Sequence, residues 1–163
     1  NFKNINARLI AASNENVWLD LDLSMYEAGA GAGSIDGLYD FSKLDSSHGV
    51  TQPVFSQTLD SMIKNIDMTN GVILKIDVDG HEFSILEGSK ELLKNKLLRS
   101  VIVELNTKSD AEVGNVISLF EECGMSLVGR GCWEQKWEEF SIANYLFARS
   151  DDLVRLKNLT NFG

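Results

Sequence analysis

The chain has 163 residues, of which 44% are hydrophobic and 24% are charged, and this composition is typical of one soluble globular domain with a core of its own. A formal net charge of -9 and a pI near 4.7 argue against a surface that binds nucleic acid. No apolar run is long enough to span a bilayer, and no segment has the form of a signal peptide. Cys123 and Cys132 could pair, but two thiols in a chain of this size more often stay reduced in the cytoplasm, and they also lack the spacing of a zinc site.

The first part of the chain predicts two strands and a loop. Residues 7–11 form a short apolar strand candidate. Residues 17–23 alternate apolar and polar side chains, which is the period of a half-buried strand. Residues 27–50 are rich in Gly, Ser and Asp and predict a long loop.

The next elements are a helix, a buried strand and a second helix. Apolar residues at helical spacing over 59–66 predict a helix, with Thr58 or Ser56 as its N-cap. The nearly continuous apolar run over 72–77 is typical of a strand that is buried on both faces of a parallel sheet. A further helix is expected over about 82–95.

The remaining elements complete an α/β fold. Residues 100–105 predict a second buried strand, and residues 109–112 have the form of a capping box before a helix that Gly124 ends. Residues 125–128 and 142–148 predict two last strands with no helix between them. We therefore expect a single domain over 1–163 with a mostly parallel sheet. The first two buried strands should be central neighbours, and 142–148 should form an antiparallel edge.

The turn after the 72–77 strand carries the strongest candidates for chemistry. Open α/β sheets bind ligands at the carboxyl ends of their strands, and Asp77, Asp79, His81 and Glu82 all fall there. A carboxylate at this place can take the proton of a hydroxyl group, and so can a histidine, whose pKa lies near neutrality. The alternatives are a helix cap for Asp77, a favourable helix dipole for Asp79 and Glu82, and an ordinary partly exposed histidine.

Other polar residues also have both a functional and a structural interpretation. Glu104 lies inside an apolar strand, where a carboxylate needs a partner, and Asn106 ends that strand; both are candidates for the acceptor site. Asp60 is expected to be a first-turn helix acid, and Trp133 and Trp137 are expected to pack at the sheet edge.

Several segments together resemble the FkbM family of S-adenosylmethionine-dependent methyltransferases. They are Lys75-Ile76-Asp77-Val78-Asp79-Gly80-His81-Glu82, Leu86-Glu87-Gly88, Val101-Ile102-Val103-Glu104-Leu105, Thr58-Leu59-Asp60 and Ala11-Ala12-Ser13. The resemblance covers roughly residues 5–148, and the 75–88 pattern is its most specific part. This chain has Asp79 where the family usually has Glu.

The resemblance implies a Rossmann-like class I methyltransferase sheet, S-adenosylmethionine as cofactor, and O-methylation of a small hydroxyl or sugar-type acceptor. It implies catalytic roles for Asp77, His81 and Glu82, cofactor contacts from Ala12, Ser13, Asp77 and Asp79, acceptor contacts from Glu104 and Asn106, and no metal. The expected partner is a small molecule, and a homo-oligomer is possible.

Such methyltransferases cradle their cofactor in a glycine-rich turn. The segment Glu27–Gly33 has that composition, but no helical pattern follows it, and no strand ending in an acid lies about twenty residues on. We interpret it as a family loop and expect the true turn to precede Asn1. The chain would then be the carboxyl-terminal part of the catalytic domain, and alone it would bind the cofactor weakly or not at all.

Two other functions stay open. Asp77-Val78-Asp79 could hold Mg²⁺ or Mn²⁺ against the diphosphate of a nucleotide sugar, as in a glycosyltransferase. That reading leaves Glu82 and Gly88 unexplained. A methyltransferase-like domain that binds a ligand or partner without catalysis is the other alternative.

Overall fold

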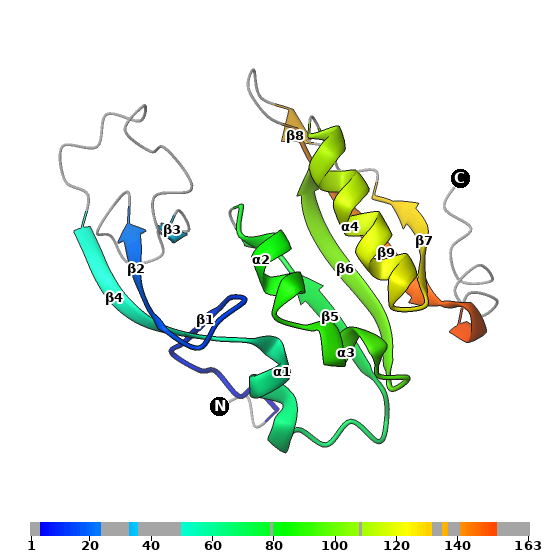
Figure 1. Ribbon diagram of the computed structural model, residues 1–163, viewed down its shortest axis with the longest axis horizontal. Helices are drawn as coiled ribbons and strands as arrows, with labels where there is room; N and C mark the ends of the chain where they lie inside the picture. Colours follow the sequence, from blue (N-terminus) through cyan, green and yellow to red (C-terminus); the bar gives the residue numbers. More distant parts are fainter. Residues whose placement is uncertain are drawn as a thin grey trace.

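The structure of the protein is a computed structural model, and it describes residues 4–23, 33–35, 50–78, 80–107, 109–131, 135–136 and 141–152. The strands are β1 (Ala11–Ala12), β2 (Trp18–Leu23), β3 (Gly33–Ile35), β4 (Val50–Gln57), β5 (Val72–Ile76), β6 (Leu98–Asn106), β7 (Met125–Arg130), β8 (Gln135–Lys136) and β9 (Ser141–Arg149). The helices are α1 (Leu59–Met62), the 3₁₀ turn Ile63–Asn65, α2 (Glu82–Glu87), α3 (Lys90–Lys94) and α4 (Asp110–Glu122). They form a mixed α/β structure with two sheets (Figure 1).

The larger sheet has the strand order β5-β6-β9-β7, with β8 paired to β9. β5 and β6 are parallel neighbours, as predicted, with Leu74 opposite Val101 and Ile76 opposite Val103. β9 runs antiparallel to both β6 and β7, so β7 points in the same direction as β5 and β6. Helices α2, α3 and α4 all contact β6 (Figure 1).

Three details of the predicted sheet are wrong. β9 is not an edge strand but lies between β6 and β7, and β5 lies at the end of this sheet's described order. The sheet is therefore not mostly parallel in its pairing, because β5 and β6 form the only parallel pair described in it. β9 carries the buried residues Ala143, Tyr145, Phe147 and Ala148, which suits an interior strand. Strand order depends on these tertiary contacts, which periodicity along the chain does not record.

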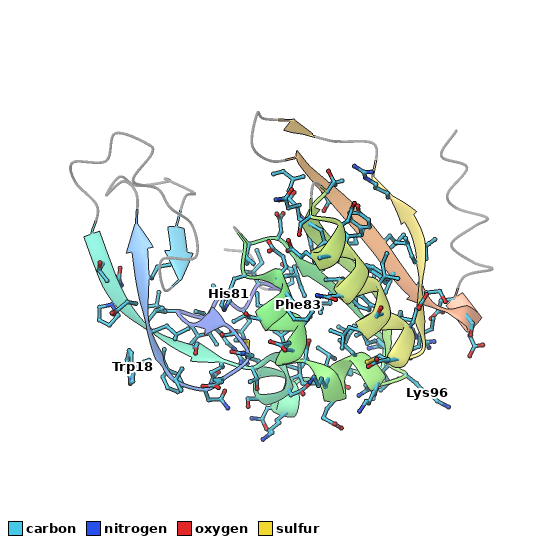
Figure 2. All side chains as sticks on the ribbon, turned by 45° about the horizontal axis from the view of Figure 1, so that its top comes forward. Trp18, His81, Phe83 and Lys96 are labelled. Atoms are coloured by element: carbon cyan, nitrogen blue, oxygen red, sulfur yellow. The ribbon has the colours of Figure 1, made fainter. Side chains whose placement is uncertain are left out.

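The smaller sheet has the order β1-β4-β2-β3, and its strand β4 was not predicted. Pro53 interrupts the strand pattern of β4, because proline cannot donate a hydrogen bond to a neighbouring strand. Pro53 pairs with Asp20 of β2, whereas β1 joins β4 only at Ser56 and Gln57. Pro53 is tolerated because β1 does not pair with β4 at this position, so no hydrogen bond to β1 is lost. Figure 2 labels Trp18 on this sheet, where 71% of its surface is exposed.

The strands at either end of the smaller sheet also differ from the prediction. The first strand is Ala11–Ala12, later and shorter than the predicted 7–11. The short strand Gly33–Ile35 lies within the predicted loop over 27–50 and pairs antiparallel with β2. The alternating strand over 17–23 is confirmed as β2.

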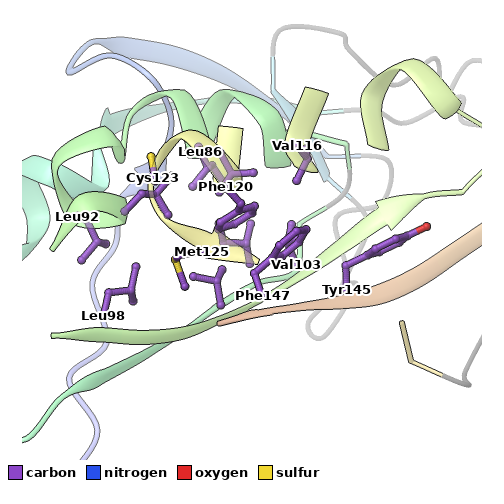
Figure 3. Packing of buried hydrophobic residues seen from close by; sticks show 14 of the residues in the cluster. Leu86, Leu92, Leu98, Val103, Val116, Phe120, Cys123, Met125, Tyr145 and Phe147 are labelled. Carbon is purple, nitrogen blue, oxygen red and sulfur yellow. The ribbon is translucent and has the colours of Figure 1, made fainter. Parts of the chain in front are cut away.

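The core of the protein lies between the larger sheet and helices α2, α3 and α4. Phe120 of α4 stacks on Phe147 of β9, with ring centroids 3.9 Å apart (Figure 3). Both rings are fully buried. A capping box has two reciprocal hydrogen bonds, and one of them is confirmed at the start of α4. The Ser109 hydroxyl accepts a hydrogen bond from the Glu112 amide. Gly124, with φ +73°, ends the helix as expected.

The predicted helix over 82–95 is divided into α2 and α3 by Gly88 and Ser89. Asp60 explains the division. Its two carboxylate oxygens accept hydrogen bonds from the amides of Leu92 and Glu91 at 2.8 and 3.0 Å, so Asp60 caps α3 from a distant part of the chain. The Asp60 amide also donates to the Gly88 carbonyl at 3.2 Å. Asp60 therefore has a structural role, beyond that of a first-turn acid.

Helix α1 begins at the predicted cap. The Thr58 hydroxyl accepts a hydrogen bond from the Ser61 amide at 3.1 Å. Ser56, the other candidate, is fully buried in β4, and its hydroxyl donates to the Glu15 carbonyl at 2.8 Å. It holds the turn before β2 in place.

Candidate functional site

The candidate site begins where the carboxyl ends of β1 and β5 meet. Ser13 follows β1, and His81 stands at the N-cap position of α2, after β5. The Ser13 hydroxyl and the His81 Nε2 atom are 2.9 Å apart and form a hydrogen bond. Figure 2 shows His81 beside β1. Two residues that are 68 positions apart in the chain, and that the sequence assigned to cofactor contact and catalysis, are thus direct neighbours.

The absence of a side chain at Gly88 allows Ser13 to lie close enough to His81 for this hydrogen bond. A Cβ atom on Gly88 would lie 2.3 Å from the Ser13 carbonyl oxygen and 2.9 Å from the Asn14 Cα. The φ angle of Gly88 is -80°, which any residue can adopt, so the close backbone contact is what requires glycine here. Ser13 is also fixed from the other side, because its amide donates to the Gln57 carbonyl at 3.0 Å.

Replacing Gly88 with Ala is expected to destabilise the fold by about 1–3 kcal/mol, because the new methyl group overlaps backbone atoms that have little room to move. Gly114→Ala is the matched control: Gly114 lies on α4 with no atom within 4 Å of an added Cβ. Alanine there should stabilise the helix by up to about 1 kcal/mol. Denaturant unfolding of both variants measures the difference. Equal effects of the two substitutions would contradict the close contact at Gly88.

Glu82 lies in the first turn of α2 and is buried, with 5% of its surface exposed. Burial raises the pKa of its carboxyl group to about 7, and the negative charges of Glu112 and Glu104 add to the rise. The Gly80 amide donates to Glu82 Oε1 at 3.3 Å and opposes this rise. A carboxyl group with this pKa can both take up and release a proton near neutral pH.

Asp77, at the end of β5, is exposed and forms an ion pair with Lys75. The two residues are two positions apart, so their side chains leave the same face of the strand. Asp77 raises the pKa of the Lys75 ammonium by accepting its hydrogen bond, and Glu104 adds a smaller effect of the same sign. The alternative of a helix cap is wrong for Asp77, because His81 holds the N-cap position of α2.

The carboxyl end of β6 brings Glu104 and Asn106 to the same edge of the sheet as Asp77, since β5 and β6 are parallel. Both side chains are half-buried. Glu104 stands opposite Asn144 of β9, and Asn106 stands opposite Ile142. Ala12 is also half-buried and packs against the core.

We call the group Ala12, Ser13, Asp77, His81, Glu82, Glu104 and Asn106 the carboxyl-edge site. Its members come from three strands and from the first turn of α2. Sequence reasoning named these seven, but it gave no site role to Lys75, Gly88 and Glu112, which act on them. The Lys75–Asp77 pair could have been found from strand alternation, whereas Gly88 and Glu112 depend on tertiary contacts.

Some of the sequence-based candidates lie outside the described residues. These are Asp79, Cys132, Trp133, Trp137 and most of the glycine-rich segment 27–33. Gly33, the last residue of that segment, begins β3, which pairs antiparallel with β2. Among the described residues, no three His, Cys, Asp or Glu side chains are grouped so that they could hold a metal ion. No helix in the described part of the chain is long and apolar enough to cross a membrane.

The chain matches a known protein family over most of its length. The family model described as the methyltransferase FkbM domain matches residues 15–127, which include Asp77, His81, Glu82 and Gly88. No curated protein and no solved structure matches the chain. Because the matched segment spans more than half of the sequence, the chain belongs to the FkbM methyltransferase family.

Proposed function

We propose that the chain is part of an S-adenosylmethionine-dependent methyltransferase that transfers a methyl group to the hydroxyl oxygen of a small molecule or sugar. The family supports methyl transfer in general. The observation that carries the choice of a hydroxyl acceptor is Glu82, a buried carboxyl group with a pKa near 7 at the carboxyl-edge site. A hydroxyl group loses its proton as its oxygen is methylated, so a proton acceptor effective at neutral pH suits that reaction.

The residues of the carboxyl-edge site suit the proposed cofactor chemically. S-adenosylmethionine carries a sulfonium cation, an amino group and two ribose hydroxyls, all of which favour nearby carboxylate oxygens. Asp77, Ala12 and Ser13 are the residues that would contact it. Asp77 is exposed and ion-paired, and Ser13 holds the end of β1 in place. When bound, the cofactor supplies an electrophilic methyl group.

The chain's own residues then have three tasks. Glu104 and Asn106 orient the acceptor, and Asp77, His81 or Glu82 takes the hydroxyl proton. Asp77 also places a carboxylate at the open edge of the sheet. Holding the reacting groups in line contributes as much as proton transfer, because methyl transfer needs little covalent help from the protein. We infer a Rossmann-like arrangement of the complete sheet from the family and from the parallel pair β5 and β6.

Labelled methyl transfer to a panel of sugars and other hydroxyl compounds tests the proposal directly. We expect label on oxygen, with a rate that rises with pH as the proton acceptor of pKa about 7 loses its proton. A panel of amines of similar size is the control. Label on nitrogen alone would show that the proposed reaction is wrong.

Replacing Asp77 with Asn is expected to lower turnover by about 10²–10⁴-fold if its carboxylate takes part in proton removal. The unfolding midpoint should change little, because the Lys75–Asp77 pair is exposed. Lys75→Gln is the matched control, since it breaks the same ion pair and keeps the carboxylate. Methyl-transfer rates and thermal unfolding are measured together for the two variants.

Three outcomes distinguish the roles of Asp77. Loss of turnover in Asp77→Asn but not in Lys75→Gln supports a role in the reaction. Near-normal turnover with a lower melting temperature in both variants would show that Asp77 has a structural role. Rescue of Asp77→Asn by added Mn²⁺ favours the metal-dependent glycosyltransferase alternative instead.

A further inference from the structure

The hydrogen bond between Ser13 and His81 constrains where the imidazole ring carries its proton. A neutral histidine has one ring nitrogen that donates and one that accepts, and the partner of each nitrogen decides which tautomer is present. Ser13 and His81 are 2.9 Å apart at Oγ and Nε2. The direction of that bond therefore fixes the tautomer of His81.

A second contact indicates the direction. The Ser13 hydroxyl is placed to donate its single proton to Asn14 Oδ1 at 3.3 Å. With the proton directed to Asn14, the Ser13 oxygen accepts from His81, and this places the ring proton on Nε2. The neutral ring then holds its lone pair on Nδ1.

Burial and backbone contacts fix the position of Ser13. Only 3% of its surface is exposed. Its amide is bonded to the Gln57 carbonyl, and its own carbonyl lies against Gly88. A serine held on these sides can orient the ring that bonds to it, in the way that an orienting group supports a catalytic histidine.

We propose that Ser13 is a positioning residue which, together with Asn14, holds His81 in the Nε2-protonated tautomer, so that Nδ1 is the only atom of His81 that can take up a proton. The catalytic meaning of this tautomer rests on the proposed function. Nδ1 is a buried atom. A proton that reaches His81 is held there, and the resulting imidazolium keeps its Nε2–H bond to Ser13. The tautomer itself can be measured without substrate or cofactor.

The chain is well suited to that measurement because it has two histidines, His48 and His81. Nitrogen-15 spectra of the imidazole rings, recorded at a pH at which the rings are neutral, separate protonated from unprotonated nitrogens. His48→Gln removes the second set of signals and assigns His81. We expect the wild-type ring to be protonated predominantly on Nε2.

Two substitutions test the parts played by Ser13 and Asn14. Ser13→Ala removes the acceptor of the Nε2–H group, and Asn14→Ala frees the Ser13 proton to donate to Nε2. Each should lower the ratio of the Nε2–H to the Nδ1–H tautomer by about threefold to tenfold, the effect of one hydrogen bond. Ser13→Thr keeps a hydroxyl group and should restore the wild-type ratio. Ser118→Ala, at an exposed position on α4, is the control and should change nothing.

The outcomes separate this inference from the proposed function. A wild-type ring protonated on Nδ1, or one ratio shared by the wild type and both alanine variants, overturns the inference even if methyl transfer is found. A shifted ratio in both alanine variants supports it even if the protein transfers no methyl group to a hydroxyl. In the active protein, Ser13→Ala should also move the pH at which turnover is half-maximal, which a purely structural role would leave in place.

Discussion

Glu82→Gln is expected to raise the free energy of unfolding by about 3 kcal/mol at about pH 8. The pKa of Glu82 is about 7 in the folded protein, against a model value of 4.5. Because the folded state binds this proton more tightly, the wild type loses stability as the pH rises from about 4.5 to about 7. Glutamine stays neutral and keeps an oxygen that can accept from the Gly80 amide, so the variant should lose this pH dependence.

The same substitution should lower methyl transfer by about 10²–10⁴-fold, because the variant cannot take up the acceptor's proton. A variant that is more stable and less active is a combination that damage to the fold cannot produce. Glu121→Gln, at an exposed position on α4, is the control and should change neither property. Denaturant unfolding between about pH 4 and pH 9 measures the stability change. An unfolding free energy of the wild type that does not fall over this range would contradict the burial effect on Glu82.

Arg149→Ala is expected to destabilise the protein by about 3–4 kcal/mol, which would be the largest loss of stability among these variants. The guanidinium group of Arg149 donates to four backbone carbonyls, those of Leu98, Cys123, Leu93 and Asn95, at 3.1, 3.1, 2.6 and 2.8 Å. These carbonyls come from β6 and from the residues that end α3 and α4. Arg149 therefore joins the start of β6 to two helix ends, whose carbonyls would otherwise lack partners.

Two further substitutions separate the bonding geometry of Arg149 from its charge. Lysine keeps the charge but has no planar fork with which to reach all four carbonyls, so Arg149→Lys should lose a part of the stability. Arg99→Ala removes an exposed arginine that pairs with Asp152 at 3.5 Å, and it should cost at most about 1 kcal/mol. Urea unfolding compares the three variants. A loss for Arg149→Ala no larger than that for Arg99→Ala would show that the four bonds contribute little.

The sequence predicted those elements whose signals are local. The runs over 72–77 and 100–105 indicated parallel neighbours, and the pairing of β5 with β6 confirms this. The expected burial of the first run on both faces is wrong, because Ile73 is 70% exposed and Lys75 is also exposed. Ser109 and Gly124 marked the two ends of α4 correctly. Each of these signals lies within a few residues of the feature that it predicts.

The errors concern contacts between distant segments. The break between α2 and α3 depends on Asp60, which lies 31 and 32 residues before the amides that it caps. The place of β9 between β6 and β7 depends on side chains that meet only in the folded sheet. The strand β4 was hidden by Pro53, whose missing N–H group matters only where a second strand pairs.

In the candidate site, too, local signals were predicted correctly, whereas contacts between distant segments were not. The acids and the histidine after β5 were identified from their place at a strand end, but the sequence did not separate their environments. Folding buries Glu82 and leaves Asp77 exposed beside Lys75, so one carboxyl group gains a pKa near 7 and the other forms an ion pair. The meeting of Ser13 with His81 depends on Gly88, whose role becomes visible only when the two segments are in contact.

We propose that the carboxyl ends of β1 and β5 form one ligand site. Backbone amide spectra recorded during titration with S-adenosylmethionine test it most directly, because they detect weak binding and locate it along the chain. We predict that the shifted signals centre on residues 12–14 and 77–82, and that Gly88→Ala, which displaces Ser13, reduces them. Shifts confined to β2 and β3, with none at residues 12–14 or 77–82, would contradict a shared site at the ends of β1 and β5.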